Sequence, residues 1–332
     1  MLRKFIFMIA GVGLILSMVG CGSAAKKSHN EKTDVRIAYF PNITHPQALV
    51  MKNQKTLEDK WQDTCNVSWV SFNAGPSEVE AIFAGEIDLG YIGPVPALSA
   101  IAKSSGDVKI ISNATDAGAV LLKGKDSGIE SVKDLSGRKV AVPQIGNTQH
   151  LCLLDLLAQN GLKTVDKGGD VTINASSNAD ILNLMDNGSV DAAVVPEPWG
   201  ATIEKNGNAE VLLEYDQLFL NGNYPVALVI AGSDFMEEHP EIVKEFLQAH
   251  EDATLYINEN TAQAQDIVNK EIESVTGKSL ETDVIKKAFD RMKVDAVLNK
   301  EAIMTFAGMS KQEGFINAVP EENDVFTTEF DQ

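Results

Sequence analysis

Hydrophobic and polar positions follow a pattern that repeats once along the chain. Apolar runs of strand length occupy residues 35–40 and 139–143, and each run leads into a helical pattern, which ends near Lys60 in the first case and near Asn160 in the second. Strands that alternate with helices are typical of parallel sheets with helices on both faces. The pattern therefore predicts an α/β fold with doubly wound sheets.

A second stretch of sequence repeats with nearly the same offset, because residues 79–92 correspond to residues 181–194. The correspondence aligns two pairs of residues: Gly85 with Gly188, and Asp88 with Asp191. Glycine ends a helix easily in the left-handed conformation, and aspartate bonds to the backbone of turns, so we interpret all four as turn residues. Two motifs that keep one offset predict two similar lobes.

Two apolar runs flank the second repeat, at residues 118–123 and 225–231. We expect the chain to cross from one lobe to the other and back along these runs, which makes a hinge of two crossings. The predicted lobe 1 comprises residues 34–119 plus 229–332, and the predicted lobe 2 comprises residues 120–228. The helical C-terminal third has no copy in the repeat, and we expect it to pack on lobe 1.

The N-terminus has the features of a secretion signal. Arg3 and Lys4 precede a mainly apolar run, residues 5–19, which is short for a transmembrane helix but suits the core of a signal peptide. The run ends at Met18-Val19-Gly20-Cys21, which resembles the lipobox of bacterial lipoproteins.

We therefore predict a lipoprotein signal peptide over residues 1–20, acylation of Cys21 and a tether over residues 21–33. The alternative is an ordinary signal peptide that is cleaved nearby. No later stretch is long and apolar enough to span a bilayer. The expected location is extracytoplasmic, with the lipid anchor as the only attachment to the bacterial cell membrane.

The charge balance limits the possible partners. The chain has 28 Lys and Arg against 47 Asp and Glu, a formal net charge of −19. A nucleic acid is attracted by clustered cations and would be repelled by this surface, so we exclude it as a partner. An anionic ligand must be held by local dipoles instead. We expect the protein to be a monomer.

Small polar residues stand at corresponding places in the two repeats. Asn42 and Thr44 follow the first predicted strand, Asn147 and Thr148 follow its counterpart, and each pair opens a helical pattern. The first N–H groups of a helix lack intrahelical partners and favour negative charge, so two facing helix starts predict a clamp for an anion. The alternative is that these side chains only cap their own helices. Gly93-Pro94 ends another strand and lets the N–H of glycine approach the ligand.

Glu197 and Trp199 follow a strand of the second lobe, where the fold would direct them into the cleft. Trp199 packs either on an organic portion of the ligand or in the core. A carboxylate repels an anion, so Glu197 has three possible roles. It pairs within the protein, caps a neighbouring backbone, or meets the ammonium group of a zwitterionic ligand such as taurine.

Histidine raises the question of a metal. His45 lies at the first helix start, and the repeat places Gln149 rather than His150 opposite it. Two imidazoles and Glu197 would suffice for a metal site, but this register argues against one, and the three cysteines form no zinc-type spacing. We predict that His45 and Gln149 contact the ligand and that the protein holds no metal and no cofactor.

Several motifs together carry a family resemblance. They are Phe40-Pro41-Asn42-Ile43-Thr44-His45, residues 84–94, Pro143-Gln144-Ile145-Gly146-Asn147-Thr148 and Val195-Pro196-Glu197-Pro198-Trp199. With the lipobox they resemble the substrate-binding lipoproteins of ABC importers, of the aliphatic sulfonate, taurine and nitrate type. The resemblance extends from about Asp34 to about Tyr256. It implies a two-lobed, type II periplasmic-binding fold and delivery of cargo to an ABC permease with a cytoplasmic ATPase.

Sequence motifs of catalysis are absent: there is no GxSxG, HExxH or Walker motif, and no GxGxxG after a strand. We therefore predict a binding protein and not an enzyme. Trp199 favours a small organic anion, an aliphatic sulfonate or taurine, over bare nitrate. The resemblance leaves nitrate, bicarbonate, a thiamine-precursor pyrimidine and a pyrimidine-synthase-like enzyme as alternatives, and a ligand-loaded sensor that docks on a membrane receptor is a further one.

Overall fold

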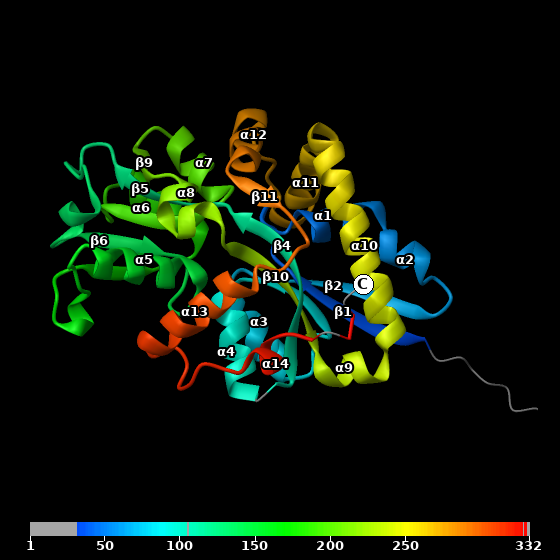
Figure 1. Cartoon of the computed structure of the whole chain (residues 1–332). Coiled ribbons are helices and arrows are strands. Elements are labelled where there is room, and N and C mark those ends of the chain that lie inside the picture. The colour runs from blue at the N-terminus through cyan, green and yellow to red at the C-terminus, as the bar shows by residue number, and fades with distance from the viewer. Residues whose placement is uncertain (1–31, 105, 328, 331–332) are drawn as a thin grey trace, which may run out of the picture. The chain divides into compact units, whose positions relative to one another are not determined.

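Two β-sheets with flanking helices account for the part of the chain that the computed structural model describes, residues 32–104, 106–327 and 329–330 (Figure 1). The predicted α/β architecture is therefore observed. The predicted signal peptide, Cys21 and nearly all of the predicted tether lie outside the described residues. No helix within the described ranges is both long and apolar enough to cross a membrane.

The first sheet has six strands in the order β11-β4-β10-β3-β1-β2. Strands β1, β2 and β3 run parallel, whereas β10 runs antiparallel to both β3 and β4. The bounds are β1 Thr33–Tyr39, β2 Cys65–Ser71, β3 Leu89–Ile92, β4 Val108–Ala117, β10 Pro225–Gly232 and β11 Met292–Val294. Because β10 pairs with β4 from Pro225 to Gly232, the predicted lobe boundary at residue 228 falls inside a strand of this sheet.

The second sheet repeats the same arrangement with five strands in the order β7-β6-β8-β5-β9. Strand β6 runs parallel to β7 and β8, and β5 runs antiparallel to β8 and β9. The bounds are β5 Ala119–Gly124, β6 Lys139–Val142, β7 Thr172–Ala175, β8 Ala192–Pro196 and β9 Ala209–Leu213. In each sheet, three parallel strands lie beside one antiparallel strand, β10 in the first sheet and β5 in the second. Each of these two strands comes directly after the chain has crossed from the other sheet. The predicted similarity of the two lobes is therefore observed.

Helices connect the strands and cover both sheets (Figure 1). Their bounds are α1 Pro46–Gln54, α2 Thr56–Lys60, α3 Gly75–Phe83, α4 Pro94–Ser104, α5 Thr148–Gln159, α6 Asn178–Asp186, α7 Trp199–Lys205, α8 Tyr215–Leu218, α9 Ser233–Glu238, α10 Pro240–Glu259, α11 Thr261–Thr276, α12 Thr282–Asp290, α13 Lys300–Gln312 and α14 Glu322–Val325. Short 3₁₀ turns occupy Val132–Leu135, Val165–Lys167 and Leu220–Gly222.

The aligned aspartates of the repeat hold strands rather than turns. Asp88 accepts hydrogen bonds from the backbone N (2.8 Å) and Nε (2.9 Å) of Arg36 in the middle of β1. Asp191 accepts from the backbone N of Lys139 (2.8 Å) at the start of β6 and pairs with Arg138. The interpretation of these aspartates as turn residues is therefore wrong, because the neighbouring strand offers a cationic partner and a free N–H group.

The chain passes between the sheets twice. The first crossing lies between β4 and β5, where Ala117 and Gly118 have left-handed φ values of 60° and 73°. The second crossing lies between β9 and β10, where Leu220 and Asn221 have φ values of 42° and 53°. Left-handed backbone disfavours side chains other than glycine, so the three non-glycine residues are held there by their surroundings.

The C-terminal third covers more than the first sheet. Helices α10 and α11 pack on α1, as predicted, but α12 packs on α7 beside the second sheet, and α13 contacts both α4 and α5. We call the part of the molecule built on the six-stranded sheet the first half and the part built on the five-stranded sheet the second half. Figure 1 shows α12 between the two halves. The prediction that this region packs on lobe 1 is thus incomplete, because sequence periodicity gives the buried face of a helix and not the partner of that face.

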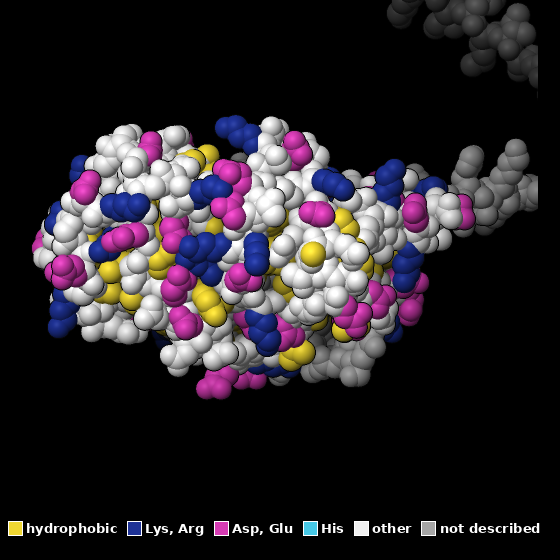
Figure 2. All heavy atoms as spheres, turned by 90° about the horizontal axis from the view of Figure 1, so that it is seen from above, with side chains coloured by type: hydrophobic (Ala, Val, Ile, Leu, Met, Phe, Trp, Pro, Cys, Tyr) yellow, Lys and Arg dark blue, Asp and Glu magenta, His cyan; other side chains and the backbone are white. Residues whose placement is uncertain are grey.

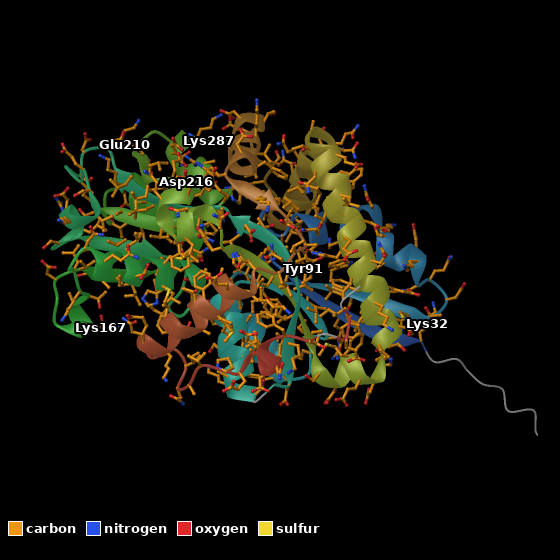
Figure 3. The ribbon with its side chains drawn as sticks, in the orientation of Figure 1. Lys32, Tyr91, Lys167, Glu210, Asp216 and Lys287 are labelled. Carbon is orange, nitrogen blue, oxygen red and sulfur yellow. The ribbon has the colours of Figure 1, made fainter. Side chains whose placement is uncertain are left out.

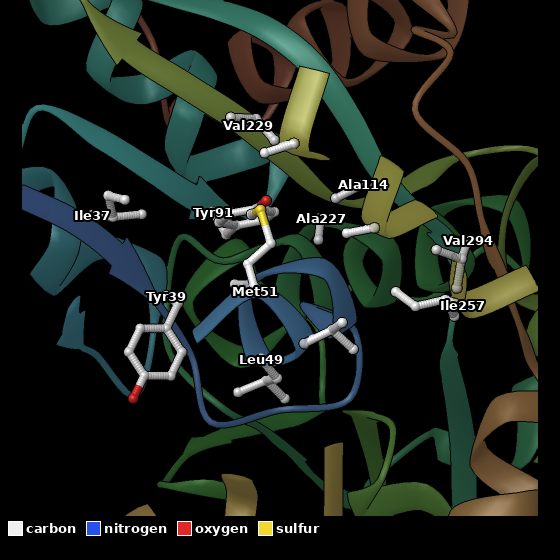
Figure 4. Close-up of a cluster of buried hydrophobic side chains, with 14 of the residues drawn as sticks. Ile37, Tyr39, Leu49, Met51, Tyr91, Ala114, Ala227, Val229, Ile257 and Val294 are labelled. Carbon is white, nitrogen blue, oxygen red and sulfur yellow. The ribbon is translucent and has the colours of Figure 1, made fainter. Parts of the chain in front are cut away.

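The core of the first half is a continuous apolar cluster between β1, β3, β10 and the helices α1 and α10 (Figure 4). Leu49 and Met51 on α1 are fully buried there, and truncating such a side chain to alanine typically costs about 2–5 kcal/mol. Tyr91, labelled in Figure 3, donates its hydroxyl to Nδ1 of His250 (2.7 Å), while Nε2 of His250 donates to the carbonyl of Asn113 (2.8 Å). Burial lowers the pKa of His250 to about 4, so this ring is neutral at physiological pH.

Candidate functional site

A cavity of about 40 Å³ lies where the carboxyl ends of the parallel strands of both sheets meet. The loops after β1, β2 and β3 line it from the first half, and the loops after β6 and β7 and the end of β8 line it from the second. Its lining residues are Phe40, Asn42, Thr44, His45, Asn73, Ala74, Gly75, Gly93, Pro96, Pro143, Asn147, Thr148, Gln149, Asn178, Pro196 and Val226. Ligands of open α/β sheets bind at this edge.

The structure brings most of the predicted site residues together in this cavity. The predicted residues on the lining are Asn42, Thr44, His45, Gly93, Asn147, Thr148 and Gln149. Five helices, α1, α3, α4, α5 and α6, begin at the lining or within a few residues of it. Their positive dipole ends and their first N–H groups therefore converge on one small volume, which favours an anion there.

The two asparagines use their side-chain oxygens within the protein. Asn42 Oδ1 accepts from the backbone N (3.0 Å) and the hydroxyl (3.1 Å) of Thr44, and Asn147 Oδ1 caps α5 by accepting from the N of His150 (2.8 Å). The capping alternative is therefore correct for Asn147, whereas Asn42 Oδ1 bonds within its own loop and caps no helix. The amide Nδ2 atoms of both residues remain as donors. Helix α1 begins only at Pro46, so the first loop forms a turn before its helix instead of opening it as predicted.

Thr148 is the polar side chain that most clearly lacks a partner. It is 3% exposed, and its Oγ1 has no hydrogen-bond partner among the described residues. A Cβ atom placed on Gly93 would lie 2.7 Å from this oxygen, so the glycine leaves the space in which the hydroxyl lies. Asn178 Oδ1, on the start of α6, is also buried without a described partner. Buried polar atoms are normally bonded, and two unbonded ones on one cavity indicate a place for a ligand.

His45 lines the cavity as a neutral donor. Its Nδ1 accepts from the backbone N of Phe40 (3.1 Å), so a neutral ring carries its proton on Nε2. Burial lowers the pKa of His45 to about 3. In the second half, Nδ1 of His150 accepts from the N of Gly146 (3.2 Å) in the same way, although His150 does not line the cavity. The residues that the repeat aligns, His45 and Gln149, both line the cavity.

A larger hollow of about 350 Å³ adjoins the cavity and shares part of its lining. The shared residues are Phe40, Asn42, Asn73, Ala74, Pro143 and Asn178. Trp199 lies on this outer hollow together with Phe72, and not on the inner cavity. No charged side chain lines either space among the described residues. The two spaces together suit a ligand with a compact head and an uncharged tail.

Glu197 and Pro94 lie away from both linings. Glu197 is fully buried, its Oε1 accepts from Nη1 of Arg291 (2.9 Å), and its Oε2 accepts from the N of Ala201 (2.9 Å). Burial raises the pKa of Glu197, and the charge of Arg291 opposes that shift. Of the three possible roles of this carboxylate, the structure supports those within the protein, and the predicted ligand contact has no geometric support. Pro94 is the first residue of α4 and directly follows Gly93 in the sequence.

The predicted site residues did not include the loops after β2 and β7, which also line the cavity. Asn73, Ala74 and Gly75 follow β2, and Asn178 follows β7. The sequence contained a signal for these two loops, because each follows a strand and precedes a helix, as the predicted ligand-binding loops do. No group of three or more His, Cys, Asp or Glu side chains in the described part of the chain is placed to hold a metal ion.

Comparisons with known proteins agree with this geometry. The model of the NMT1-like family matches residues 28–270. A protein of Bacillus subtilis (strain 168) that is named for the binding of aliphatic sulfonates is 28% identical over 264 residues, 78% of this chain and 76% of that protein. The taurine-binding periplasmic protein of Escherichia coli (strain K12) is 31% identical over 190 residues, 56% of each chain.

Similarity to solved structures extends over more of the chain. The alkanesulfonate-binding protein of Xanthomonas axonopodis pv. citri, bound to MOPS, superimposes with a TM-score of 0.74 at 24% identity, covering 89% of this chain and 99% of that chain. The similarity confirms the predicted periplasmic-binding fold of two lobes joined by two crossings. These three relatives are named as binding proteins and not as enzymes.

Proposed function

The chain belongs to the NMT1-like family, and from this membership and the cavity we propose that it is a solute-binding protein for sulfonates that carry an uncharged organic tail. The observation that carries the proposal is the inner cavity, whose described lining has no charged side chain and includes the hydroxyl of Thr148, which has no partner among the described residues. The names of the relatives, which refer to aliphatic sulfonates and taurine, support the same class of cargo.

The sulfonate head suits the inner cavity for electrostatic reasons. A singly charged oxyanion gains from several helix starts at once, and a hydrogen bond to a charged group contributes about 1.5–3 kcal/mol. Four or five such bonds, less the cost of dehydrating the anion, are compatible with a dissociation constant in the micromolar range, about −8 kcal/mol. The oxygens of the head would meet donors from both halves, for example His45 Nε2 and Thr148 Oγ1.

The tail would lie in the outer hollow, against Phe72 and Trp199. Taurine ends in an ammonium group, which needs an acidic or strongly polar partner when it is desolvated. Glu197 is the carboxylate considered for this role, and it is bonded to Arg291. We therefore place an alkanesulfonate ahead of taurine, and both ahead of nitrate, which would leave the outer hollow unused.

Calorimetric titration of the full-length protein with hexanesulfonate, taurine, nitrate and a thiamine-precursor pyrimidine tests this proposal. We expect hexanesulfonate to bind in the micromolar range, and Thr148→Val to weaken it about tenfold or more. Thr115→Val is the matched control, because Thr115 has a buried, unpartnered hydroxyl that does not line the cavity. Tight binding of the pyrimidine alone, or equal losses in both variants, would contradict the proposal.

We also propose that the protein works outside the cytoplasm, anchored through an acylated Cys21, and that it delivers its cargo as a monomer to an ABC permease. The support is the lipobox-like sequence before Cys21 and the periplasmic location in the name of one relative. Cys21→Ala should release the chain from washed membranes into the soluble fraction without a change in sulfonate affinity. A variant that still sediments with the membranes would rule out this anchor.

A further inference from the structure

Arg291 binds three carboxylates that all belong to the second half of the molecule. It follows α12 and directly precedes β11 of the first sheet, and it is only 4% exposed. Its Nη1 donates to Glu197 Oε1 (2.9 Å), Nη2 donates to Glu204 Oε2 (3.0 Å), and Nε and Nη2 donate to the two oxygens of Glu214 (2.9 and 2.8 Å). We call this group of four side chains the Arg291 junction.

The junction lies at the first crossing between the sheets. The backbone N of Gly118, one of the two left-handed residues of that crossing, donates to the carbonyl of Arg291 (2.9 Å). The carbonyl of Gly118 in turn accepts from the backbone N of Glu197 (2.8 Å). The backbone of Arg291 is thus bonded to the crossing, and its side chain is bonded to Glu197, whose own N–H group is bonded to the same crossing.

The junction is also joined to the ligand site by the chain itself. Glu197 is flanked by Pro196, which lines the inner cavity, and it lies two residues before Trp199 on the outer hollow. Its second oxygen caps α7 at Ala201, and a Cβ on Gly200 would lie 2.7 Å from its first oxygen, so the carboxylate is tightly enclosed. Glu197 therefore lies, tightly enclosed, between a residue of the inner lining and a residue of the outer lining.

We propose that Arg291 is a positioning residue of the ligand site: by holding Glu197 across the first crossing, it fixes the wall formed by Pro196 and Trp199 against the first half and keeps the halves closed. It touches no ligand. The affinity part of this inference rests on the proposed function, because it uses a sulfonate as the probe.

The charges explain why an arginine is needed. Three carboxylates surround one cation, and Glu197 has no access to water, so loss of the guanidinium leaves a buried charge unpaired and removes the attraction between the halves. Only a planar guanidinium offers several donors in fixed directions to separate carboxylates.

Acidic and basic side chains lie intermixed on the face seen in Figure 2. Lys287, labelled in Figure 3, also pairs with Glu204, from Nζ to Oε1 (2.6 Å), but its side chain is 45% exposed.

The test compares Arg291→Met with Lys287→Met in the full-length protein. Both changes remove a cation that bonds Glu204, but only the first leaves Glu197 unpaired. Small-angle scattering of the ligand-free variants should show a larger radius of gyration for Arg291→Met and no change for Lys287→Met. Hexanesulfonate should bind Arg291→Met at least tenfold more weakly and Lys287→Met within twofold of the parent. We expect Arg291→Lys to resemble Arg291→Met.

A rescue variant separates positioning from general loss of stability. In Arg291→Met combined with Glu197→Gln, no charge is buried and the glutamine oxygen still caps Ala201, so the affinity should recover by severalfold. If Arg291→Met does not fold, the single Glu197→Gln change replaces it and should weaken binding more than Lys287→Met. Unchanged scattering and unchanged affinity in Arg291→Met would overturn the inference. If the parent binds no sulfonate, the proposed cargo fails, and the scattering comparison still tests the hinge.

Discussion

The inner cavity and the Arg291 junction are neighbours along the chain, because Pro196 lines the first and Glu197 belongs to the second. Both are buried and rich in polar groups, yet the described lining of the cavity has no charged side chain, whereas the junction holds four. In the junction every charge has a partner inside the protein. In the cavity, the hydroxyl of Thr148 and the amide oxygen of Asn178 are left without one among the described residues.

This contrast teaches how an acidic protein can hold an anion. A cation in the cavity would be drawn to the many carboxylates of the chain, and the junction shows that Arg291 is indeed neutralised by three of them. Helix starts, amides and hydroxyls cannot be neutralised in this way, because their donors belong to the backbone or to uncharged groups. The predictions that follow test whether the cavity must remain neutral.

The largest effect is expected from a negative charge placed in the cavity. Thr148→Asp would put a carboxylate among the donors that await the ligand, where it can satisfy them itself and repel a sulfonate. We expect hexanesulfonate affinity to fall more than a hundredfold in calorimetry, about 3 kcal/mol. Thr148→Asn is the control, since it is uncharged and of similar size, and its loss should be about tenfold. Equal losses in the two variants would show that shape and not charge governs this site.

Much of this arrangement could be predicted from the sequence, because the features concerned are local. A strand followed by a small polar residue and a helical pattern is read within a few positions, which is why Asn42, Thr44, Asn147 and Thr148 were found. The direction of Glu197 could not be predicted, since its partner Arg291 lies 94 residues further along the chain. The C-terminal third that carries Arg291 has no copy in the repeat, so no internal comparison could indicate its role.

The neutrality of His45 gives the last and smallest test. Its pKa is about 3 in the folded protein and about 6.5 in an unfolded chain, so between these values the unfolded state binds the proton and stability is lost as the pH falls. Relative to His45→Gln, the unfolding free energy of the parent should drop by about 2 kcal/mol between pH 7.5 and about pH 5, measured by urea denaturation. His150 and His250, present in both proteins, cancel in this difference.

Sulfonate affinity of the parent should stay within twofold down to about pH 5.5, and the ring resonances of His45 should not shift in NMR spectra. A gain in affinity of tenfold or more on acidification would show that an imidazolium forms beside the ligand, and the cavity would then resemble the Arg291 junction in using charge.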